Sequence, residues 1–142
     1  MDGLVKNIPG FRDEAIYRGE QVFFYKRAQI LAADLHAAFG MTLFSDIDKM
    51  TMFPDYRVPQ ILRERAVLVY SPDLQHKIDS LTEIPHSAEE EIEIRAACIK
   101  VCDSLAELAQ KLPIEIDWLL WQLGEKCLKS LKPHHRTLSI FY

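Results

Sequence analysis

The sequence predicts a mainly α-helical domain of the α+β class, with one small β-hairpin near its N-terminus. Apolar residues recur at helical spacing over most of the chain, whereas strand-like runs occur at one place only. The 142 residues are enough for one domain with a single core, so we expect residues 1–142 to form one unit.

The hairpin is expected where two β-prone runs, 11–16 and 21–25, flank a glycine-containing turn at 17–20. An isolated hairpin is marginally stable, so this one has to pack against the rest of the chain. A helix is predicted over 26–39, because apolar residues recur there at helical spacing and Gly40 follows as a natural stop.

The sequence in the middle of the chain predicts two short elements and the start of a further helix. Ser45 or Asp46 is expected to cap a short turn that runs through Met50. A short helix carrying Ile61 and Leu62 comes next. The triplet at 71–73, Ser-Pro-Asp, is typical of a helix start, since it combines a hydroxyl cap, a proline at the first helical position and an acid in the first turn.

A long helix is predicted from the capping-box pair Ser87 and Glu90 to Pro113. The acidic run 89–91 at its positive end indicates a cap and a solvated face. Arg95, four residues beyond Glu91, indicates an exposed ion pair. The inward face is expected to carry Ile92, Ala96, Ile99, Cys102, Leu105 and Leu112.

The last helix is predicted from Asp117, interpreted as its cap, to about Leu131. Trp118 and Trp121 lie three residues apart on one face, so core packing is the default interpretation for both. The apolar tail that ends at Tyr142 is expected to dock on the body of the protein.

The composition excludes several classes of function. A net charge of −4 argues against non-specific binding to nucleic acid or to anionic membranes. No apolar run approaches the ~20 residues of a membrane-spanning helix, and we expect no signal peptide. Three cysteines without CxxC spacing indicate a reducing compartment, and we therefore expect a cytoplasmic protein. Cys98 and Cys102 are expected to be buried thiols, and no metal site is predicted.

The most informative stretch is 51–60, in which Pro54 and Pro59 bracket Asp55. The residue before each proline avoids the α region, so Asp55 is expected on a stiff, non-helical bend. Such a bend can position a catalytic carboxylate. The alternative is a helix entry, in which Asp55 caps the helix and Pro59 lies in its first turn.

Several stretches of the chain together form a recognisable pattern: 10–13, 24–31 with Ala33-Asp34, 51–60, Tyr70-Ser71, 91–95, 117–121, His135-Arg136 and Phe141-Tyr142. The lysine-arginine helix start and the proline-bracketed aspartate are specific in combination. Together these stretches resemble the C-terminal portion of the queuosine salvage protein family, the queuosine 5'-phosphate N-glycosylases.

The resemblance implies a fold akin to the helical DNA glycosylases. It implies hydrolysis of the bond between the 7-deazaguanine base queuine and ribose 5'-phosphate, which releases queuine for tRNA queuosine salvage. The implied substrate is a small nucleotide, queuosine 5'-phosphate, with no metal, no cofactor, no direct binding of nucleic acid and no membrane partner.

The sequence departs from the family pattern in two ways. Family members carry a further N-terminal half, which contributes part of the base pocket. The alternative function is therefore a catalytically incomplete helical fragment, acting as an interaction module or as half of a split enzyme whose partner supplies that half. Pro54 also stands where the family usually has a small residue, which stiffens the bend or shifts Asp55.

The candidate catalytic residues are Asp55 and Lys26. Breaking an N-glycosidic bond builds positive charge on the sugar, and a carboxylate below the anomeric carbon stabilises that charge. Asp55 is our candidate for this carboxylate, and a nearby cation would keep it ionised. Lys26 is our candidate for the cation, because a lysine at a helix N-terminus is disfavoured by the helix dipole. The alternative for Lys26 is a solvated surface residue.

The other candidates are substrate-binding residues, and each has a structural alternative. Arg57 is expected either to fix the bend or to bind the 5'-phosphate, and Gln60 belongs to the same stretch. His135 and Arg136 form the other candidate phosphate clamp, or else dock the tail. Phe53 and Tyr56 are expected to stack on the flat base, with packing as the alternative for at least one of them.

Overall fold

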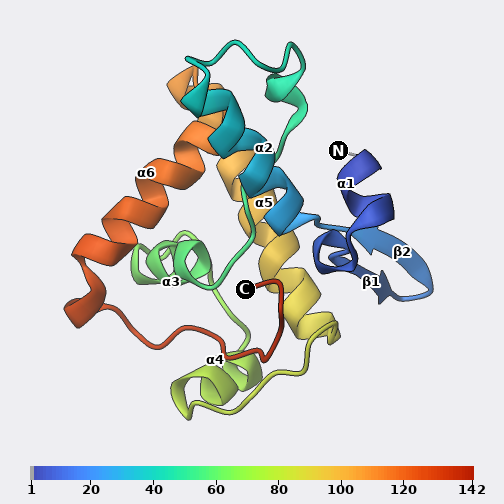
Figure 1. Ribbon diagram of the computed structural model, residues 1–142. Coiled ribbons are helices and arrows are strands. Elements are labelled where there is room, and N and C mark those ends of the chain that lie inside the picture. The colour runs from blue at the N-terminus through green and yellow to red at the C-terminus, as the bar shows by residue number, and fades with distance from the viewer. Residues whose placement is uncertain (1) are drawn as a thin grey trace.

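The computed structural model describes residues 2–142 (Figure 1). This part of the chain is mainly helical, with one two-stranded antiparallel sheet. The elements run in the order α1 (Asp2–Asn7), η1 (Pro9–Phe11), β1 (Glu14–Tyr17), β2 (Glu20–Phe23), α2 (Lys26–Ala38), η2 (Ile47–Lys49), α3 (Arg57–Glu64), α4 (Pro72–Asp79), α5 (Glu89–Ala109), α6 (Pro113–Lys126) and η3 (Leu128–Ser130).

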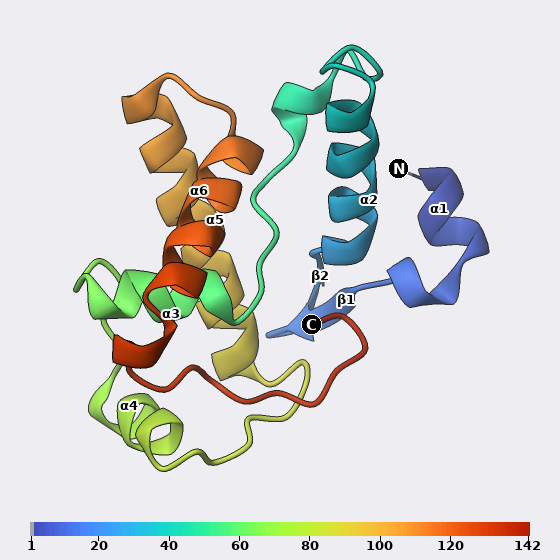
Figure 2. The ribbon, with the colours of Figure 1, turned by 60° about the vertical axis from the view of Figure 1, so that its left-hand side comes forward.

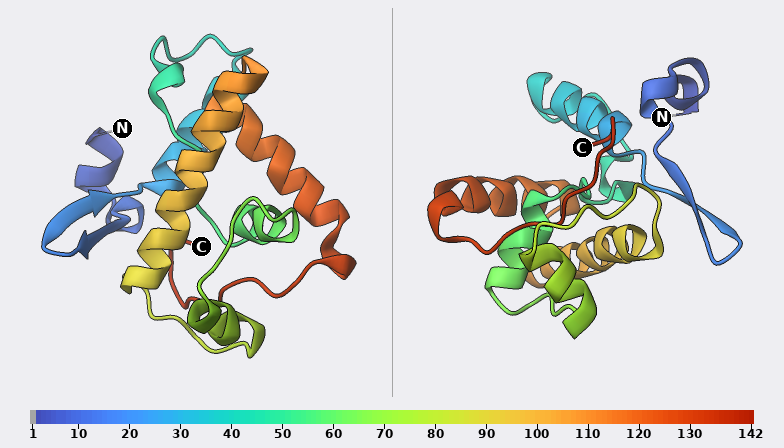
Figure 3. Two further views of the ribbon diagram at one scale, coloured as in Figure 1. Left: turned by 180° about the vertical axis from the view of Figure 1, so that it is seen from behind. Right: turned by 90° about the horizontal axis from the view of Figure 1, so that it is seen from below.

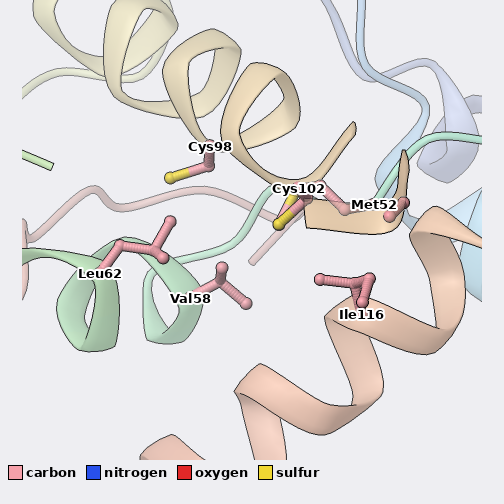
Figure 4. Packing of buried hydrophobic residues seen from close by; sticks show 7 residues of the cluster. Met52, Val58, Leu62, Cys98, Cys102 and Ile116 are labelled. Atoms are coloured by element: carbon pink, nitrogen blue, oxygen red, sulfur yellow. The ribbon is translucent and has the colours of Figure 1, made fainter. Parts of the chain in front are cut away.

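Helix α5 is the longest helix and runs through the middle of the molecule, with α2 on one side and α3 and α6 on another (Figure 1; Figure 2). The core lies where α3, α5 and α6 meet (Figure 4). Its buried members are Met52, Val58, Leu62, Cys98, Cys102, Ala106 and Ile116. The two cysteines on α5 are fully buried free thiols, which confirms their predicted role as core residues.

The N-terminal hairpin is confirmed, with Glu14 opposite Phe23 and Tyr17 opposite Glu20. It packs on α5 through a small apolar cluster of Ala15, Phe24 and Ile92. Together with α1 it stands out from the helical body on the side away from α6 (Figure 3). This packing supplies the support that an isolated hairpin requires.

The C-terminal tail docks on the body, as predicted. Residues after η3 run back past α4, and Glu83 and Arg136 form an isolated parallel bridge. The Thr137 hydroxyl donates to the carbonyl of Ile84 at 2.9 Å. His135 and Phe141 are buried, so the tail is part of the folded structure.

Two predicted helix starts are wrong. Helix α5 begins after Ala88 and not at a Ser87 cap; Ser87 has a positive φ, and its backbone N–H donates to Glu91. Helix α6 begins at Pro113, with Leu112 as its N-cap, and Glu115 accepts the N–H of Leu112 at 2.8 Å. Pro113 therefore opens a helix instead of ending one, as proline at the first helical position commonly does.

Burial along α5 also differs from the prediction. Glu91 and Arg95 were expected on a solvated face, but they are 0% and 1% exposed, whereas Ala96 is exposed. Their charges are paired inside the protein, which allows charged side chains at positions where apolar ones were expected. The helix starting at Ser71 is confirmed, since Ser71 Oγ accepts the N–H of Leu74 at 3.3 Å. Among the described residues, none of the helices is both long and apolar enough to cross a bilayer.

Candidate active site

Asp55 lies on the bend between the 51–54 segment and α3, and it is 6% exposed. Its Oδ1 atom accepts the backbone N–H of Arg57 at 2.8 Å and that of Val58 at 3.1 Å. Asp55 thus caps α3, as the helix-entry interpretation predicts. Both of these hydrogen bonds go to Oδ1, and the same side chain lines a cavity. The cap therefore fixes the orientation of a carboxylate that faces open space.

The cavity has a volume of about 370 Å³. It is bounded by α2, by the 53–55 bend and by α6, and it combines ionisable groups with aromatic walls. The residues that line it are Lys26, Ile30, Asp34, Phe53, Asp55, Asp117, Trp118 and Trp121. A pocket with an apolar wall and a few convergent polar groups is the usual form of a small-molecule site.

Lys26 is held at the first position of α2. Its backbone N–H donates to Asp13 Oδ2 at 3.2 Å, and its side chain is buried, 9% exposed. Burial lowers the pKa of the Lys26 ammonium, while the neighbouring carboxylate of Asp55 opposes that shift. Within residues 2–142, no carboxylate lies within ion-pair distance of the ammonium. Lys26 is thus a buried cation that faces a cavity, and the solvated-surface alternative does not describe it.

Three carboxyl groups share this cavity with Lys26, those of Asp34, Asp55 and Asp117. Burial raises the pKa of Asp55 above its usual value. The N–H groups that Asp55 caps at the start of α3 and the charge of Lys26 act in the opposite direction and lower it in part. Burial also raises the pKa of Asp117, to about 7, with the charge of Asp55 adding to the rise. Asp117 Oδ2 accepts the N–H of Phe53 at 3.0 Å, which ties α6 to the bend. The interpretation of Asp117 as the cap of its helix is wrong, because it lies in the second turn of α6.

Behind the bend lies a paired set of charges around Arg95. Its guanidinium forms a bidentate ion pair with Asp13, contacts Glu91 at 3.3 Å and donates through Nε to the carbonyl of Pro54 at 3.3 Å. The Arg95 guanidinium also lies 3.8 Å from the centre of the Phe24 ring. Asp13 in turn holds the start of α2. One arginine thereby links the elements that carry Asp55 and Lys26.

A second cavity, of about 310 Å³, is polar and lies beside the C-terminal tail. It is lined by Tyr56, Glu83, His134, His135, Arg136, Thr137, Leu138 and Tyr142. His135 is 1% exposed, and its Nδ1 has no hydrogen-bond partner in the described structure. Burial lowers the pKa of His135 to about 3, so the ring is neutral near pH 7.

The two cavities are neighbours. A shallow hollow between them is lined by Lys26, Ile30 and Asp34, which also line the Asp55 cavity, and by Tyr142, which also lines the polar one. Within residues 2–142, no cluster of three or more histidine, cysteine or acidic side chains is arranged to hold a metal ion. The arrangement therefore suits an elongated ligand with a flat apolar end and a polar end.

Comparison with known proteins identifies the family. The profile of the queuosine salvage protein family matches residues 1–142. The chain belongs to this family. It is 51% identical over 150 residues to a queuosine 5'-phosphate N-glycosylase/hydrolase of Dictyostelium discoideum, covering 100% of this chain and 47% of that protein. The relative of the same name in Sphaerobacter thermophilus (strain ATCC 49802 / DSM 20745 / KCCM 41009 / NCIMB 13125 / S 6022) is 43% identical, with 100% and 46% covered. The one in Mus musculus is 38% identical, with 100% and 47% covered.

The chain therefore spans about half the length of the curated relatives it matches. Of the site residues that the queuosine salvage resemblance implied, Lys26, Asp55 and Phe53 line the first cavity. Tyr56, His135 and Arg136 line the polar one. These two sets come together through the hollow that Lys26 and Tyr142 border.

Arg57 and Gln60 line neither cavity. Arg57 Nε pairs with Glu125 at 2.6 Å and its Nη1 donates to Gln60, whose amide donates to the Lys132 carbonyl at 2.6 Å. A Cβ on Gly124 would lie 2.7 Å from Arg57 Cδ, so the arginine packs directly against α6. These contacts favour the structural alternative for Arg57 over phosphate binding, and substrate binding by either residue stays a prediction.

The site residues predicted from the sequence leave out five residues of the Asp55 cavity: Ile30, Asp34, Asp117, Trp118 and Trp121. The sequence predicts a cap role for Asp117 and core packing for the two tryptophans, yet all three line the cavity and Trp121 is 45% exposed. The available signal was an aspartate one helical turn past Pro113, among residues predicted to be buried. Within a helix interior such an acid has no capping role and requires another reason.

Proposed function

We propose that this chain carries the catalytic centre of a queuosine 5'-phosphate N-glycosylase, which hydrolyses the N-glycosidic bond and releases queuine for tRNA queuosine salvage. The observation that carries the proposal is the meeting of Lys26 and Asp55 in one cavity in a member of this family. Both side chains are buried, and they influence each other electrostatically although they do not approach within ion-pair distance. Burying such charges costs folding free energy, and a catalytic role explains why they persist.

The proposed mechanism assigns Asp55 to the sugar. As the bond between the base and C1' breaks, positive charge develops on the sugar ring, and the Asp55 carboxylate stabilises it electrostatically. Asp55 then accepts a proton from the water that adds to C1'. The ammonium of Lys26 favours the ionised form of Asp55 and contributes to holding it.

The walls of the two cavities suit the other parts of the nucleotide. The aromatic side chains of Phe53, Trp118 and Trp121 offer flat faces for the base. Arg136, in the polar cavity, is exposed and offers a guanidinium to the 5'-phosphate, with His134 beside it. In this proposal the fold is akin to that of the helical DNA glycosylases. The reaction takes place in the cytoplasm, in keeping with three free cysteines.

The test is hydrolysis of queuosine 5'-phosphate by the purified chain, with free queuine measured by mass spectrometry. Asp55→Asn keeps a side-chain oxygen for the N–H groups of Arg57 and Val58 but removes the charge. We expect it to lower kcat by about 100-fold or more, while the melting temperature stays at or above that of the wild type.

Asp103→Asn is the matched control, because Asp103 is a partly buried aspartate on α5 that does not line the cavity. Wild-type activity in Asp55→Asn would show that the assignment of Asp55 is wrong.

A second candidate function is half of a two-part enzyme. Two observations favour it: the chain spans about half of its relatives' length, and an apolar groove of about 650 Å³ opens beside α1, β2 and α2. Its lining includes Leu4, Phe23, Leu35 and Phe44. Burying such a groove under another polypeptide is favourable, because exposed apolar patches of this kind mark interaction sites.

The part of the Dictyostelium discoideum relative that this chain does not cover is the probe for this alternative. Under the split-enzyme hypothesis, adding it to the chain should give a 1:1 complex in size-exclusion chromatography with light scattering, and should raise the rate of queuine release. Leu35→Glu, in the groove, should weaken the complex, whereas Leu108→Glu, on the exposed face of α5, should not. Full activity of the chain alone, with no complex, would contradict this function.

A further inference from the structure

We propose that Asp117 is the proton donor to the leaving base, an inference that rests on the function proposed above. Asp117 and Asp55 come from different elements, α6 and the 53–55 bend, and they line the same cavity together with Lys26. Enzymes that hydrolyse glycosidic bonds usually use two carboxyl groups, which flank the reacting bond. The two groups then need different protonation states, one to give a proton and one to stabilise positive charge.

The hydrogen bonds around the pair indicate which group holds the proton. Asp55 accepts two backbone N–H groups at the N-terminus of α3, where the helix dipole also favours a negative charge. Within residues 2–142, Asp117 accepts one backbone N–H, from Phe53, and it lies beyond the first turn of its helix between aromatic walls. When the pair carries a single proton, the anion is better stabilised on Asp55 and the proton belongs on Asp117.

The ionisable groups that face Asp117 come from each neighbouring element. Lys26 and Asp34 approach from α2, Asp55 from the bend, and Cys98 and Cys102 from α5. Lys26 stabilises the ionised form of Asp117, but burial and the charge of Asp55 outweigh it and raise the pKa of Asp117 to about 7. A donor whose pKa lies near the working pH is the effective kind.

The leaving base makes this proton necessary. When the C1'–N9 bond breaks, its electron pair goes to the base, and an anionic base is a poor leaving group. Queuine has carbon at position 7, so the donor must deliver its proton to another heteroatom of the base. Asp117 loses this proton while Asp55 gains one from the attacking water. Exchange with solvent then restores both groups, and the net reaction consumes one water molecule.

The kinetic test compares two substrates. Queuosine 5'-phosphate needs a protonated leaving group, whereas 4-nitrophenyl ribofuranoside 5-phosphate releases a stable phenolate. In Asp117→Asn, the amide oxygen still accepts the Phe53 N–H. We expect kcat for the first substrate to fall by about 100-fold or more, and kcat for the second to change by less than about fivefold, with KM little altered. Asp103→Asn should match the wild type on both.

The wild-type pH profile for the first substrate should decline above about pH 7, and the variant should lose that decline. Equal losses on both substrates, or loss on neither, would overturn the proposal, because a purely structural Asp117 makes no distinction between leaving groups.

A second measurement does not depend on turnover. The side-chain carboxyl signals of ¹³C-labelled aspartates are followed by NMR as the pH is changed, and the Asp117 signal is the one missing from Asp117→Asn. We expect its midpoint near 7. A midpoint below about 5 would overturn the assignment. If the chain releases no queuine, the proposed function of the chain alone fails, and this titration still decides whether Asp117 can hold a proton near neutral pH.

Discussion

The Arg95 network and the Asp55 cavity both place charged side chains inside the protein, and they meet at the Pro54–Asp55 bend. In the network, Arg95 is paired with Asp13 and Glu91, and the Tyr142 hydroxyl donates to Glu91 at 2.5 Å. In the cavity, Lys26, Asp55 and Asp117, all within the described residues, do not approach one another within ion-pair distance. Paired charges hold the scaffold together, whereas charges that face open space remain available to a ligand.

The same difference appears in the effect of burial. In the cavity, burial prevails over the other influences: it raises the pKa of Asp55 and Asp117 and lowers that of Lys26. In the network, burial disfavours the charged form of Arg95, but the hydrogen bond to Asp13 outweighs it and the pKa of Arg95 is raised. Buried groups whose neutral forms are favoured are candidates for proton transfer, and groups whose charged forms are favoured are structural.

The largest expected effect comes from breaking the network. Arg95→Met leaves Asp13 and Glu91 buried without their cation, and we expect the free energy of unfolding to fall by about 3–5 kcal/mol. Urea denaturation measures this loss. Arg18→Met is the control, because the ion pairs of Arg18 with Glu89 and Glu93 are exposed and should contribute less than about 1 kcal/mol. Equal losses in the two variants would remove the distinction between the network and surface charges.

In the cavity, removing a charge should raise the free energy of unfolding instead of lowering it. Asp117 has a raised pKa in the folded protein, so its contribution to folding stability is greatest below the usual pKa of 3.8 and falls as the pH rises to about 7. Asp117→Asn removes this loss. We expect the variant to be more stable than the wild type at pH 8, by an amount on the order of 2 kcal/mol, and the difference to shrink towards pH 4.

Denaturation at the two pH values tests this difference. If Asp117→Asn is less stable than the wild type at pH 8, Asp117 has a structural role like that of the charged residues in the Arg95 network.

The smallest expected effect comes from Gly124→Ala, which tests whether Arg57 is a structural residue. The new methyl group meets Arg57 Cδ and Cγ, and crowding of this kind should destabilise the protein by about 1–2 kcal/mol. Gly3→Ala is the control, since no atom lies within 4 Å of the added group. If Arg57 is structural, the KM of Gly124→Ala for queuosine 5'-phosphate should stay unchanged. A clear rise in KM with normal stability would indicate that Arg57 binds the 5'-phosphate.

Local signals predicted much of this fold correctly. The hairpin, helix α2, the start of α4 and the docked tail all depend on turn residues, caps and apolar spacing that lie close together in the sequence. The bend at Asp55 was also visible, because prolines restrict the backbone regardless of the surroundings. The double role of Asp55, as a cap and as a cavity residue, was not visible, because the cavity wall comes from α2 and α6.

The failures at buried charged residues share one cause. Glu91, Arg95 and Asp117 were assigned to solvated or capping positions because charged side chains usually lie there. Their burial depends on partners that are remote in the chain: Asp13 lies 82 residues from Arg95, and Phe53 lies 64 residues from Asp117. No local pattern contains such pairings. A buried ion pair therefore cannot be distinguished from a surface ion pair by sequence spacing alone.

The wide spacing of the cavity residues has a consequence for synthesis on the ribosome. Lys26 emerges first, Asp55 next and Asp117 last. Residues that close long loops assemble late, because many intervening residues must first be ordered. A nascent chain therefore keeps these groups hydrated and apart until α6 has left the exit tunnel, and the pocket forms only when the surrounding apolar core is able to form with it.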